Sequence, residues 1–260
     1  EPYRRQRQMC IRDRHYDGYI DELKPEFEGK DVIIVAAGPS LDKNVELLKN
    51  KKPGIIILAV ETVFRKLLKL GIDVNYMIVT DANSRIYSHL AGLEEEQIPM
   101  LYLATAYKGY SMNYCGKKYL ICQNGYDRAQ ELAKQKGWHL YETGGSVSTT
   151  ALDVCIYLGC KSIAFIGLDL AYTDNLAHAT DTSRRAVSET EEMKQVPAIG
   201  GGTVPVSRLF TIYNRWISSR VKKADVTMPV IDATEGGAIV PGLTVMALKE
   251  YMEKIAGKSE

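Results

Sequence analysis

The chain has 260 residues, of which 45% are hydrophobic and 25% are charged. Its 33 basic and 32 acidic residues leave a formal net charge of +1, which excludes a general electrostatic attraction to nucleic acid or to an anionic membrane. The length predicts one large domain or two small ones, with enough residues to bury a sizeable core.

No apolar run approaches the ~20 residues of a membrane-spanning helix, and the first residues carry no apolar stretch typical of a secretion signal. The five cysteines form no C-x-x-C pair, which argues against a disulfide framework or a zinc site. We therefore expect a cytoplasmic protein without a membrane span.

Residues 1–30 differ from the rest of the chain, because five arginines fall between Arg4 and Arg14. We interpret this stretch as a basic helical segment with a solvated face, and the alternative is a site for an anionic partner. The predicted division is therefore a segment 1–30 and a single α/β nucleotide-binding domain 31–260.

From residue 31 onward, short apolar runs alternate with amphipathic stretches. The expected strands are Val32–Ala36, Ile55–Val60, Tyr76–Val79, Met100–Leu103, Lys118–Ile121, Ser162–Ile166 and Val226–Ile231. The expected helices are Leu41–Leu48, Val63–Leu70, Tyr126–Lys136, Val147–Leu158, Ser207–Lys223 and Leu243–Ile255. This alternation predicts a Rossmann-like α/β fold, a doubly wound and mostly parallel sheet flanked by helices.

Residues 172–206 show no clear periodicity, and a loop of this length predicts a functional lid. In doubly wound folds the ligand lies at the carboxyl ends of the strands, so the loops that follow strands are the candidate sites.

The first candidate loop contains Gly38, Pro39 and Ser40. A glycine directly after a buried strand lets a ligand approach the backbone, and Ser40 is a suitable N-cap for a helix whose free N–H groups attract an anion. The alternative is a tight turn without a ligand.

A second glycine-rich helix start contains Thr143, Gly144, Gly145 and Ser146. Taken alone it is an ordinary N-cap. Two such helix starts in one sheet favour a binding site for an anion such as a phosphate.

Three further residues follow the strand that ends at Ile166. Asp169 lies at its carboxyl end and is either a catalytic group or a hydrogen-bonding partner of a neighbouring loop. Tyr172 follows it, and His178 lies in the long polar loop, where a general base or a phosphate contact is expected.

Two other loops carry polar residues in comparable positions. Thr80 and Asp81 follow the third expected strand, where a carboxylate can hold a ribose, an acceptor hydroxyl or Mg²⁺. Glu235 and Gly236 follow the last strand, in a loop that is either close to a ligand or a tight turn.

These motifs, in this order, resemble the domain shared by bacterial flagellar motility accessory factors and archaeal 6-hydroxymethylpterin diphosphokinases. The resemblance covers roughly residues 15–255. The segments that carry it are Val32–Leu41, Thr80–Asp81, Gly167–Tyr172 and Thr234–Ala238.

Two segments also resemble bacterial sialyltransferases that use CMP-sialic acid, namely Gly38–Leu41 and Thr143–Tyr172. That resemblance implies that the glycine loop and the second helix start hold CMP, that a tyrosine holds the phosphate and that a histidine is the base. The corresponding positions here are Gly38, Ser40, Thr143, Gly144, Ser146, Tyr172 and His178.

Three functions remain open from the sequence. The first is a glycosyltransferase that moves a nonulosonic, sialic-acid-like sugar from a CMP donor to a protein or glycan hydroxyl, with no cofactor required. The second is a diphosphokinase that acts on a pterin alcohol and requires ATP and Mg²⁺, with Asp81 and Asp169 as metal ligands. The third is a non-catalytic nucleotide-binding accessory protein.

Overall fold

The structure is a computed structural model and describes residues 15–173, 176, 178–182 and 193–256. Within these residues, no helix combines the length and the apolar character that crossing a membrane requires.

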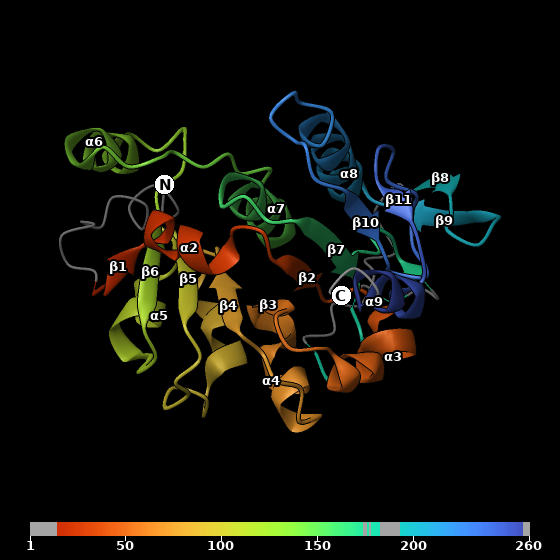
Figure 1. Ribbon diagram of the computed structural model, residues 1–260, viewed down its shortest axis with the longest axis horizontal. Coiled ribbons are helices and arrows are strands. Elements are labelled where there is room, and N and C mark those ends of the chain that lie inside the picture. Colours follow the sequence, from red (N-terminus) through yellow and green to blue (C-terminus); the bar gives the residue numbers. More distant parts are fainter. Residues whose placement is uncertain (1–14, 174–175, 177, 183–192, 257–260) are drawn as a thin grey trace.

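A nine-stranded sheet forms the centre of the molecule (Figure 1), and neighbouring strands within it pair in parallel. The strand order is β1-β6-β5-β4-β3-β2-β7-β10-β11. The strands are β1 (Gly18–Tyr19), β2 (Asp31–Val35), β3 (Ile56–Val60), β4 (Tyr76–Val79), β5 (Met100–Leu103), β6 (Lys118–Ile121), β7 (Ser162–Ile166), β10 (Val230–Asp232) and β11 (Thr244–Val245).

Helices cover both faces of the sheet, with α7 and α8 above it and α3 and α4 below it in Figure 1. The predicted Rossmann-like α/β class is therefore confirmed. The longer helices are α4 (Glu61–Lys69), α6 (Asp127–Lys136), α7 (Val147–Tyr157), α8 (Arg208–Arg220) and α9 (Leu248–Ala256). The shorter helical segments are η2 (Ile20–Leu23), α2 (Lys24–Phe27), α3 (Leu41–Asn44), η3 (Val45–Asn50), η4 (Ser84–Leu90) and α5 (Lys108–Asn113).

The core follows from this layering. The central strands β2, β3 and β7 are covered on both faces, so the apolar runs Val32–Val35 and Ile56–Val60 are buried along their whole length. Continuous rather than alternating apolar runs are typical of strands in a parallel sheet.

Part of the first 30 residues belongs to the same sheet. Tyr19 of β1 pairs with Leu120 of β6, and Tyr19 and Phe27 are buried in the common core. Residues 1–14, which carry the arginines, lie outside the described residues, so the basic helical segment and the boundary at residue 30 stay predictions.

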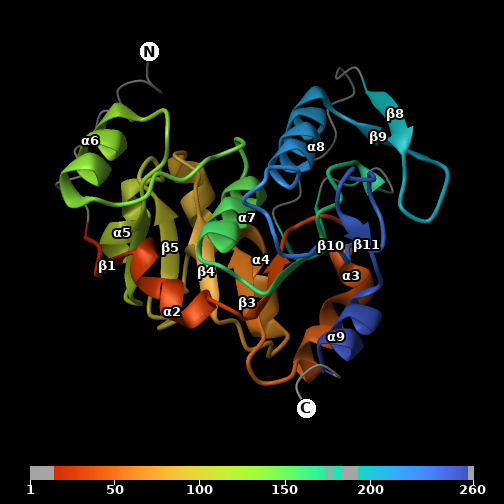
Figure 2. The ribbon, with the colours of Figure 1, turned by 45° about the horizontal axis from the view of Figure 1, so that its top comes forward.

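The expected loop 172–206 differs from the structure in its second half. β8 (Lys194–Pro197) and β9 (Thr203–Val206) form an antiparallel hairpin, which lies beside α8 at one end of the molecule (Figure 2). The turn is made by Gly200–Gly202, whose φ angles of +89°, +102° and +72° favour glycine. Val206 packs with Ala171, so the hairpin is attached to the domain.

The order in which the chain adds strands to the sheet changes direction at β2. Successive strands β3 to β6 extend the sheet on one side of β2, whereas β7, β10 and β11 extend it on the other. Such a switch point opens a crevice at the carboxyl ends of the strands, and ligands of doubly wound folds bind there.

Candidate functional site

A pocket of about 170 Å³ lies at this switch point. Its walls come from separate parts of the chain: Gly38 after β2, Ser146–Ser148 at the start of α7, His178, and Phe210 and Tyr213 of α8. Three of the predicted motifs therefore supply residues to one pocket, which we call the switch-point pocket.

The start of α7 is a well-ordered helix N-terminus. Ser146 Oγ accepts a hydrogen bond from Thr149 N at 3.2 Å, and Thr149 Oγ1 accepts one from Ser146 N at 3.1 Å. This capping leaves the N–H groups of Val147 and Ser148, which have no acceptor within the helix, at the wall of the pocket. They and the positive end of the helix dipole favour an anionic ligand group.

The glycines before α7 are shaped by α8. A Cβ on Gly144 would lie 2.5 Å from the Trp216 ring, and Gly145 has a φ of +92° with Tyr213 beside it. Thr143 is half-buried and is not among the residues that line the pocket. The two glycines thus allow α8 to pack closely against this helix start.

Asp169 is one of the residues that line the pocket, and its carboxylate also binds the neighbouring loop. It is 1% exposed, and its carboxylate accepts hydrogen bonds from Ser40 N at 3.1 Å, Ser40 Oγ at 2.7 Å and Thr173 Oγ1 at 2.8 Å. Burial raises the pKa of Asp169, while the hydrogen bonds from Ser40 and Thr173 oppose that shift. These hydrogen bonds are the ones that the structural alternative for Asp169 expects, and its catalytic role stays a prediction.

The same contact corrects the prediction for Ser40. Ser40 precedes α3, but its side chain makes no capping bond and donates to Asp169 instead. Because Ser40 N also donates to Asp169, this group is not available to an anion, and α3 is only four residues long.

Gly38 is required by this packing. A Cβ at Gly38 would lie 2.1 Å from Asp169 Oδ2 and 2.5 Å from the Gly167 carbonyl oxygen. The close approach predicted for Gly38 is therefore made by the loop after β7, while the glycine backbone still lines the pocket.

The loop after β10 completes the interlocked arrangement. A Cβ on Gly236 would lie 2.0 Å from Ser40 Oγ. The Glu235 carboxylate accepts hydrogen bonds from Asn44 Nδ2 at 3.1 Å and from Leu248 N, at the start of α9, at 3.0 Å. Glu235 and Gly236 therefore join the loop after β10 to α3, to the start of α9 and to the loop after β2, which fits the tight-turn alternative.

A strap, residues 178–182, crosses the end of β2 and brings His178 to the pocket. Ala179 N donates to Ala37 O at 2.8 Å. Thr180 is held by Asp42 Oδ2, which accepts from its N–H at 2.9 Å, and by Lys66 Nζ, which donates to its carbonyl at 3.0 Å. Lys66 is buried and forms an ion pair with Asp42, so α3, α4 and the strap share one polar contact.

Tyr172 lies beside the pocket wall. Its ring packs on Phe210 with centroids 5.1 Å apart, and its N–H donates to Pro205 O of β9 at 2.9 Å. Phe210 lines the pocket and Tyr172 does not, so α8 supplies the aromatic wall.

Asp81 is exposed at the end of β4, after the half-buried Thr80, and its Oδ1 accepts from Asn83 N at 2.7 Å. Burial, followed by the charge of Asp81, raises the pKa of Tyr213, a residue of the switch-point pocket. The charge of Asp81 therefore reaches a residue of the switch-point pocket.

Several polar residues lie near Asp81, namely Glu61, His89, Tyr110 and Tyr213, and of these only Glu61 had a recognisable signal in the sequence. Glu61 is 5% exposed at the first position of α4. Burial, opposed by its own N–H and reinforced by the charge of Asp81, raises the pKa of Glu61 to about 8. A carboxyl group that directly follows a strand was a usable signal.

Within the described part of the chain, no group of three or more His, Cys, Asp or Glu side chains is placed to hold a metal ion. The two carboxylates predicted as Mg²⁺ ligands also differ in setting, because Asp169 is enclosed by its hydrogen bonds whereas Asp81 is exposed. Asp81 is thus the more accessible of the two.

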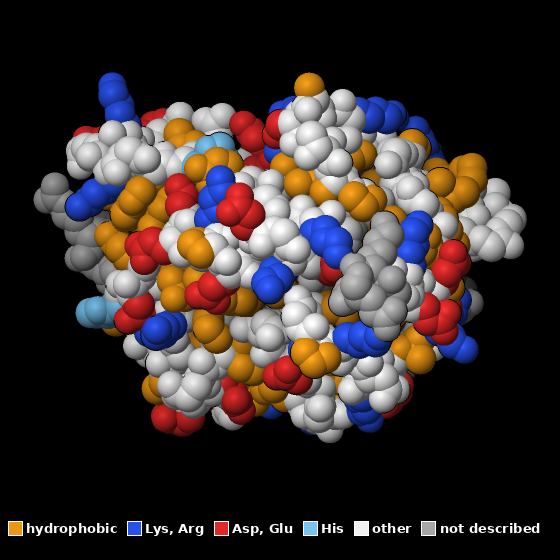
Figure 3. Space-filling view, viewed as in Figure 1, with side chains coloured by type: hydrophobic (Ala, Val, Ile, Leu, Met, Phe, Trp, Pro, Cys, Tyr) orange, Lys and Arg blue, Asp and Glu red, His pale blue; other side chains and the backbone are white. Residues whose placement is uncertain are grey.

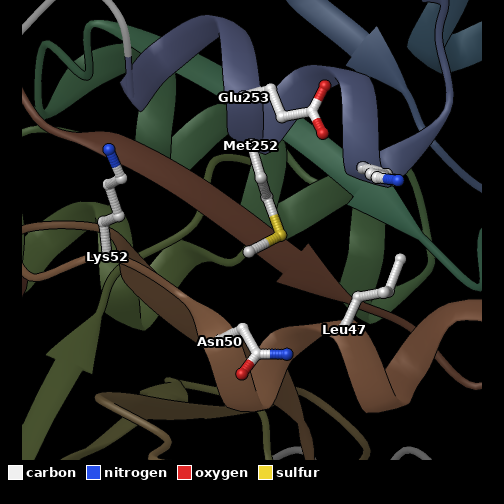
Figure 4. Close-up of a pocket in the computed structure, with 6 residues that line it drawn as sticks. Leu47, Asn50, Lys52, Met252 and Glu253 are labelled. Carbon is white, nitrogen blue, oxygen red and sulfur yellow. The ribbon is translucent and has the colours of Figure 1, made fainter.

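Other parts of the described surface differ from this site. Positive and negative side chains are interspersed over the face in Figure 3, in keeping with the balanced charge. A roomier hollow of about 410 Å³ lies between η3 and α9 (Figure 4), where Met252 points inward and Lys52 and Glu253 stand at the rim. It lies towards the amino end of β3 and contains none of the predicted residues.

The comparisons with known proteins agree with this architecture. A family profile described as 6-hydroxymethylpterin diphosphokinase MptE-like matches residues 13–175, which is more than half of the chain. Among solved structures, the MAf glycosyltransferase from Magnetospirillum magneticum AMB-1 is similar, with a TM-score of 0.70 and 15% identity. The match covers 94% of this chain and 38% of that one, so the likeness shows a shared fold over less than half of the longer protein. No curated protein matches the chain.

Proposed function

The chain belongs to the 6-hydroxymethylpterin diphosphokinase MptE-like family, and on that premise we propose that it is a transferase that binds a nucleotide-linked donor in the switch-point pocket. The carrying observation is the convergence of the α7 N-terminus and His178 on one pocket. An anion-binding helix start beside a basic side chain suits the departure of a phosphate and the deprotonation of an acceptor.

The transferred group that we propose is a nonulosonic, sialic-acid-like sugar carried by CMP. The acceptor oxygen forms a bond to the anomeric carbon while the bond from that carbon to the CMP phosphate breaks. CMP leaves with the electron pair, and the acceptor proton passes to His178. The N–H groups of Val147 and Ser148 then stabilise the charge on the departing phosphate.

The pocket walls support this arrangement. Leu168, Ala171 and Phe210 give an apolar, partly aromatic surface on the β7 side, which suits a nucleotide base. The acceptor is a protein or glycan hydroxyl, and the step requires no metal ion.

The family match favours a second candidate, a diphosphokinase that transfers diphosphate from ATP to a pterin alcohol. This reaction needs Mg²⁺ to neutralise the phosphates. Asp81, exposed at the end of β4, is the residue that would hold the ion together with the phosphates. Asp169 would have to give up its bonds to Ser40 and Thr173 to join it.

A thermal-shift titration with CMP, CDP, ATP and AMP, each with and without Mg²⁺, separates the candidates. A ligand that binds only the folded chain raises its melting temperature. We expect cytidine nucleotides to stabilise the chain regardless of Mg²⁺. Stabilisation by ATP that depends on Mg²⁺ would replace the first candidate by the second, and no stabilisation by any nucleotide would remove both.

A further inference from the structure

Three buried side-chain atoms near the carboxyl ends of β3 and β4 have no hydrogen-bond partner among the described residues: Glu61 Oε2, His89 Nδ1 and the Tyr110 hydroxyl. Glu61 is 5% exposed and Tyr110 is fully buried. Leaving a buried polar group unpaired is costly, so such atoms call for a specific explanation.

The three residues share one charged neighbour, although they come from α4, η4 and α5. The charge of Asp81 acts on the pKa of Glu61, of His89 and of Tyr110. In each case burial is the larger cause of the shift. We call Glu61, Asp81, His89 and Tyr110 the acid cluster.

The acid cluster adjoins the switch-point pocket. Val60 and Thr62, on either side of Glu61 in the chain, line that pocket. Tyr213 also lines it and is within electrostatic reach of Asp81. The two sites are therefore neighbours along one edge of the sheet.

Their electrostatic characters are opposite. The pocket presents the N-terminus of α7, which attracts anions, whereas the cluster presents the exposed carboxylate of Asp81, which repels them. Aromatic rings stand beside the cluster, with Tyr87 edge-on to Tyr107 at 6.0 Å and to Tyr110 at 5.4 Å. The Tyr107 N–H donates to the Asp81 carbonyl at 2.8 Å, which ties these rings to the end of β4.

We propose that the acid cluster is the acceptor subsite, and that it takes an uncharged ring compound whose hydroxyl or N–H groups donate to Asp81 and Glu61. This inference rests on the proposed function, in which the donor phosphate occupies the neighbouring pocket. An uncharged acceptor avoids repulsion by the Asp81 carboxylate, and a ring suits the tyrosines around the cluster. A sugar and a bicyclic aromatic alcohol share this chemistry.

Calorimetric titration with matched pairs of probes tests the proposal, on the whole chain saturated with CMP and again with ATP. One pair is galactose and galacturonic acid, and the other is 6-hydroxymethylpterin and pterin-6-carboxylic acid. Within each pair the ring is kept and the hydroxymethyl group is replaced by a carboxylate. We expect one uncharged probe to bind at least about tenfold more tightly than its anionic partner, since a buried like charge is strongly disfavoured.

Asp81→Asn keeps the shape of the side chain and removes its charge. We expect it to weaken binding of the uncharged probe about tenfold, because a hydrogen bond to a charged group is lost, and to narrow the preference over the anion. Asp73→Asn is the matched control, since Asp73 is also an exposed aspartate but precedes the amino end of β4, whereas Asp81 follows its carboxyl end. This control substitution should leave the affinities for the uncharged and the anionic probes unchanged.

Equal binding of the two members of each pair, or an unchanged affinity in Asp81→Asn, would overturn the proposal. If CMP or ATP binds and neither uncharged probe does, the acceptor subsite is wrong while the proposed function stands. If an uncharged probe binds with the expected preference and no nucleotide binds, the proposed function fails and the subsite remains.

Discussion

The carboxyl edge of the sheet has two halves that are built differently. On one side of the switch point, the loops after β2, β7 and β10 contact mainly one another. Ser40 donates a hydrogen bond to Asp169, and Gly236 packs closely against Ser40. On the other side, the ends of β3 and β4 carry Glu61 and Asp81, where buried atoms of Glu61, His89 and Tyr110 have no partner.

The contrast is one of degree. In the interlocked half, Asn44 Oδ1 and Asp232 Oδ2 also lack partners, although both side chains make other hydrogen bonds. A glycine-rich motif after a strand can therefore serve the packing of the fold, while unpaired polar groups that a ligand could use lie elsewhere on the same edge.

The largest effect is expected at His178, the one side chain of the strap that lines the switch-point pocket. His178→Ala should lower kcat for transfer by roughly 10²- to 10⁴-fold, because a general base is removed. The Kd for CMP should stay nearly unchanged. His15→Ala, at an exposed histidine, is the control. Full transfer by His178→Ala would show that the base lies in the acid cluster or elsewhere.

The interlocked half should be sensitive to any added side-chain atom. Gly38→Ala places a methyl group against Asp169 and the Gly167 carbonyl, so we expect a loss of more than about 3 kcal/mol in the free energy of unfolding. Gly54→Ala is the control, because Gly54 has a φ of +90° and open space around it, and should lose only about 1 kcal/mol. Urea unfolding measures both. Equal losses would contradict the interlocking.

Particular strands show how much of these two halves could be predicted from the sequence. The bounds of β4, β5, β6 and β7 agree with the expected strands, because a strand buried on both faces reads as a continuous apolar run. The short strands β8 and β9 were missed, since four residues that include a proline give no clear alternation.

The candidate site was predicted less completely. Gly38, Ser146 and His178 were expected near a ligand and do line one pocket. The contact between Ser40 and Asp169 joins residues 129 positions apart, and local sequence patterns carry no information on such a pair. Tyr110 was missed for a related reason, because its burial depends on how α5 packs.

The acid cluster should show itself in the pH dependence of stability. Asp81 is the charged group that acts on Glu61, and the pKa of Glu61 rises from the ordinary 4.5 to about 8. A raised carboxyl pKa means that the buried neutral form stabilises the fold fully below pH ~4.5, and that this contribution is lost as the pH rises towards ~8.

Glu61→Gln should therefore gain stability relative to the natural chain by about 1.4 kcal/mol per pH unit across that window. Urea unfolding of both proteins at about pH 5 and about pH 8 measures the change. Asp232, whose pKa burial raises to about 6, titrates in both proteins and cancels in the comparison. A difference that does not vary with pH would mean that Glu61 is charged in the folded chain, which would weaken the contrast between the halves.

The smallest effect is expected at Lys66, which joins the two halves. Lys66 comes from α4, the helix that begins with Glu61, and it holds Thr180 of the strap together with Asp42. Lys66→Met keeps the apolar stem and removes the charge, so Thr180 of the strap loses one of the two side chains that hold it. We expect kcat to fall about tenfold with KM for the donor little changed, because misplacing a base impairs the reacting geometry more than ground-state binding.

Lys66→Arg should restore most of the rate, since the guanidinium can still donate to Thr180 and pair with Asp42. Lys51→Met is the matched control, because Lys51 is another largely buried lysine and pairs with Asp73, before the amino end of β4. If Lys66→Met lowers kcat no more than Lys51→Met does, the strap keeps His178 in place without Lys66. The bonds from Ala179 to Ala37 and from Thr180 to Asp42 would then suffice, and the interlocked half would position the base without help from α4.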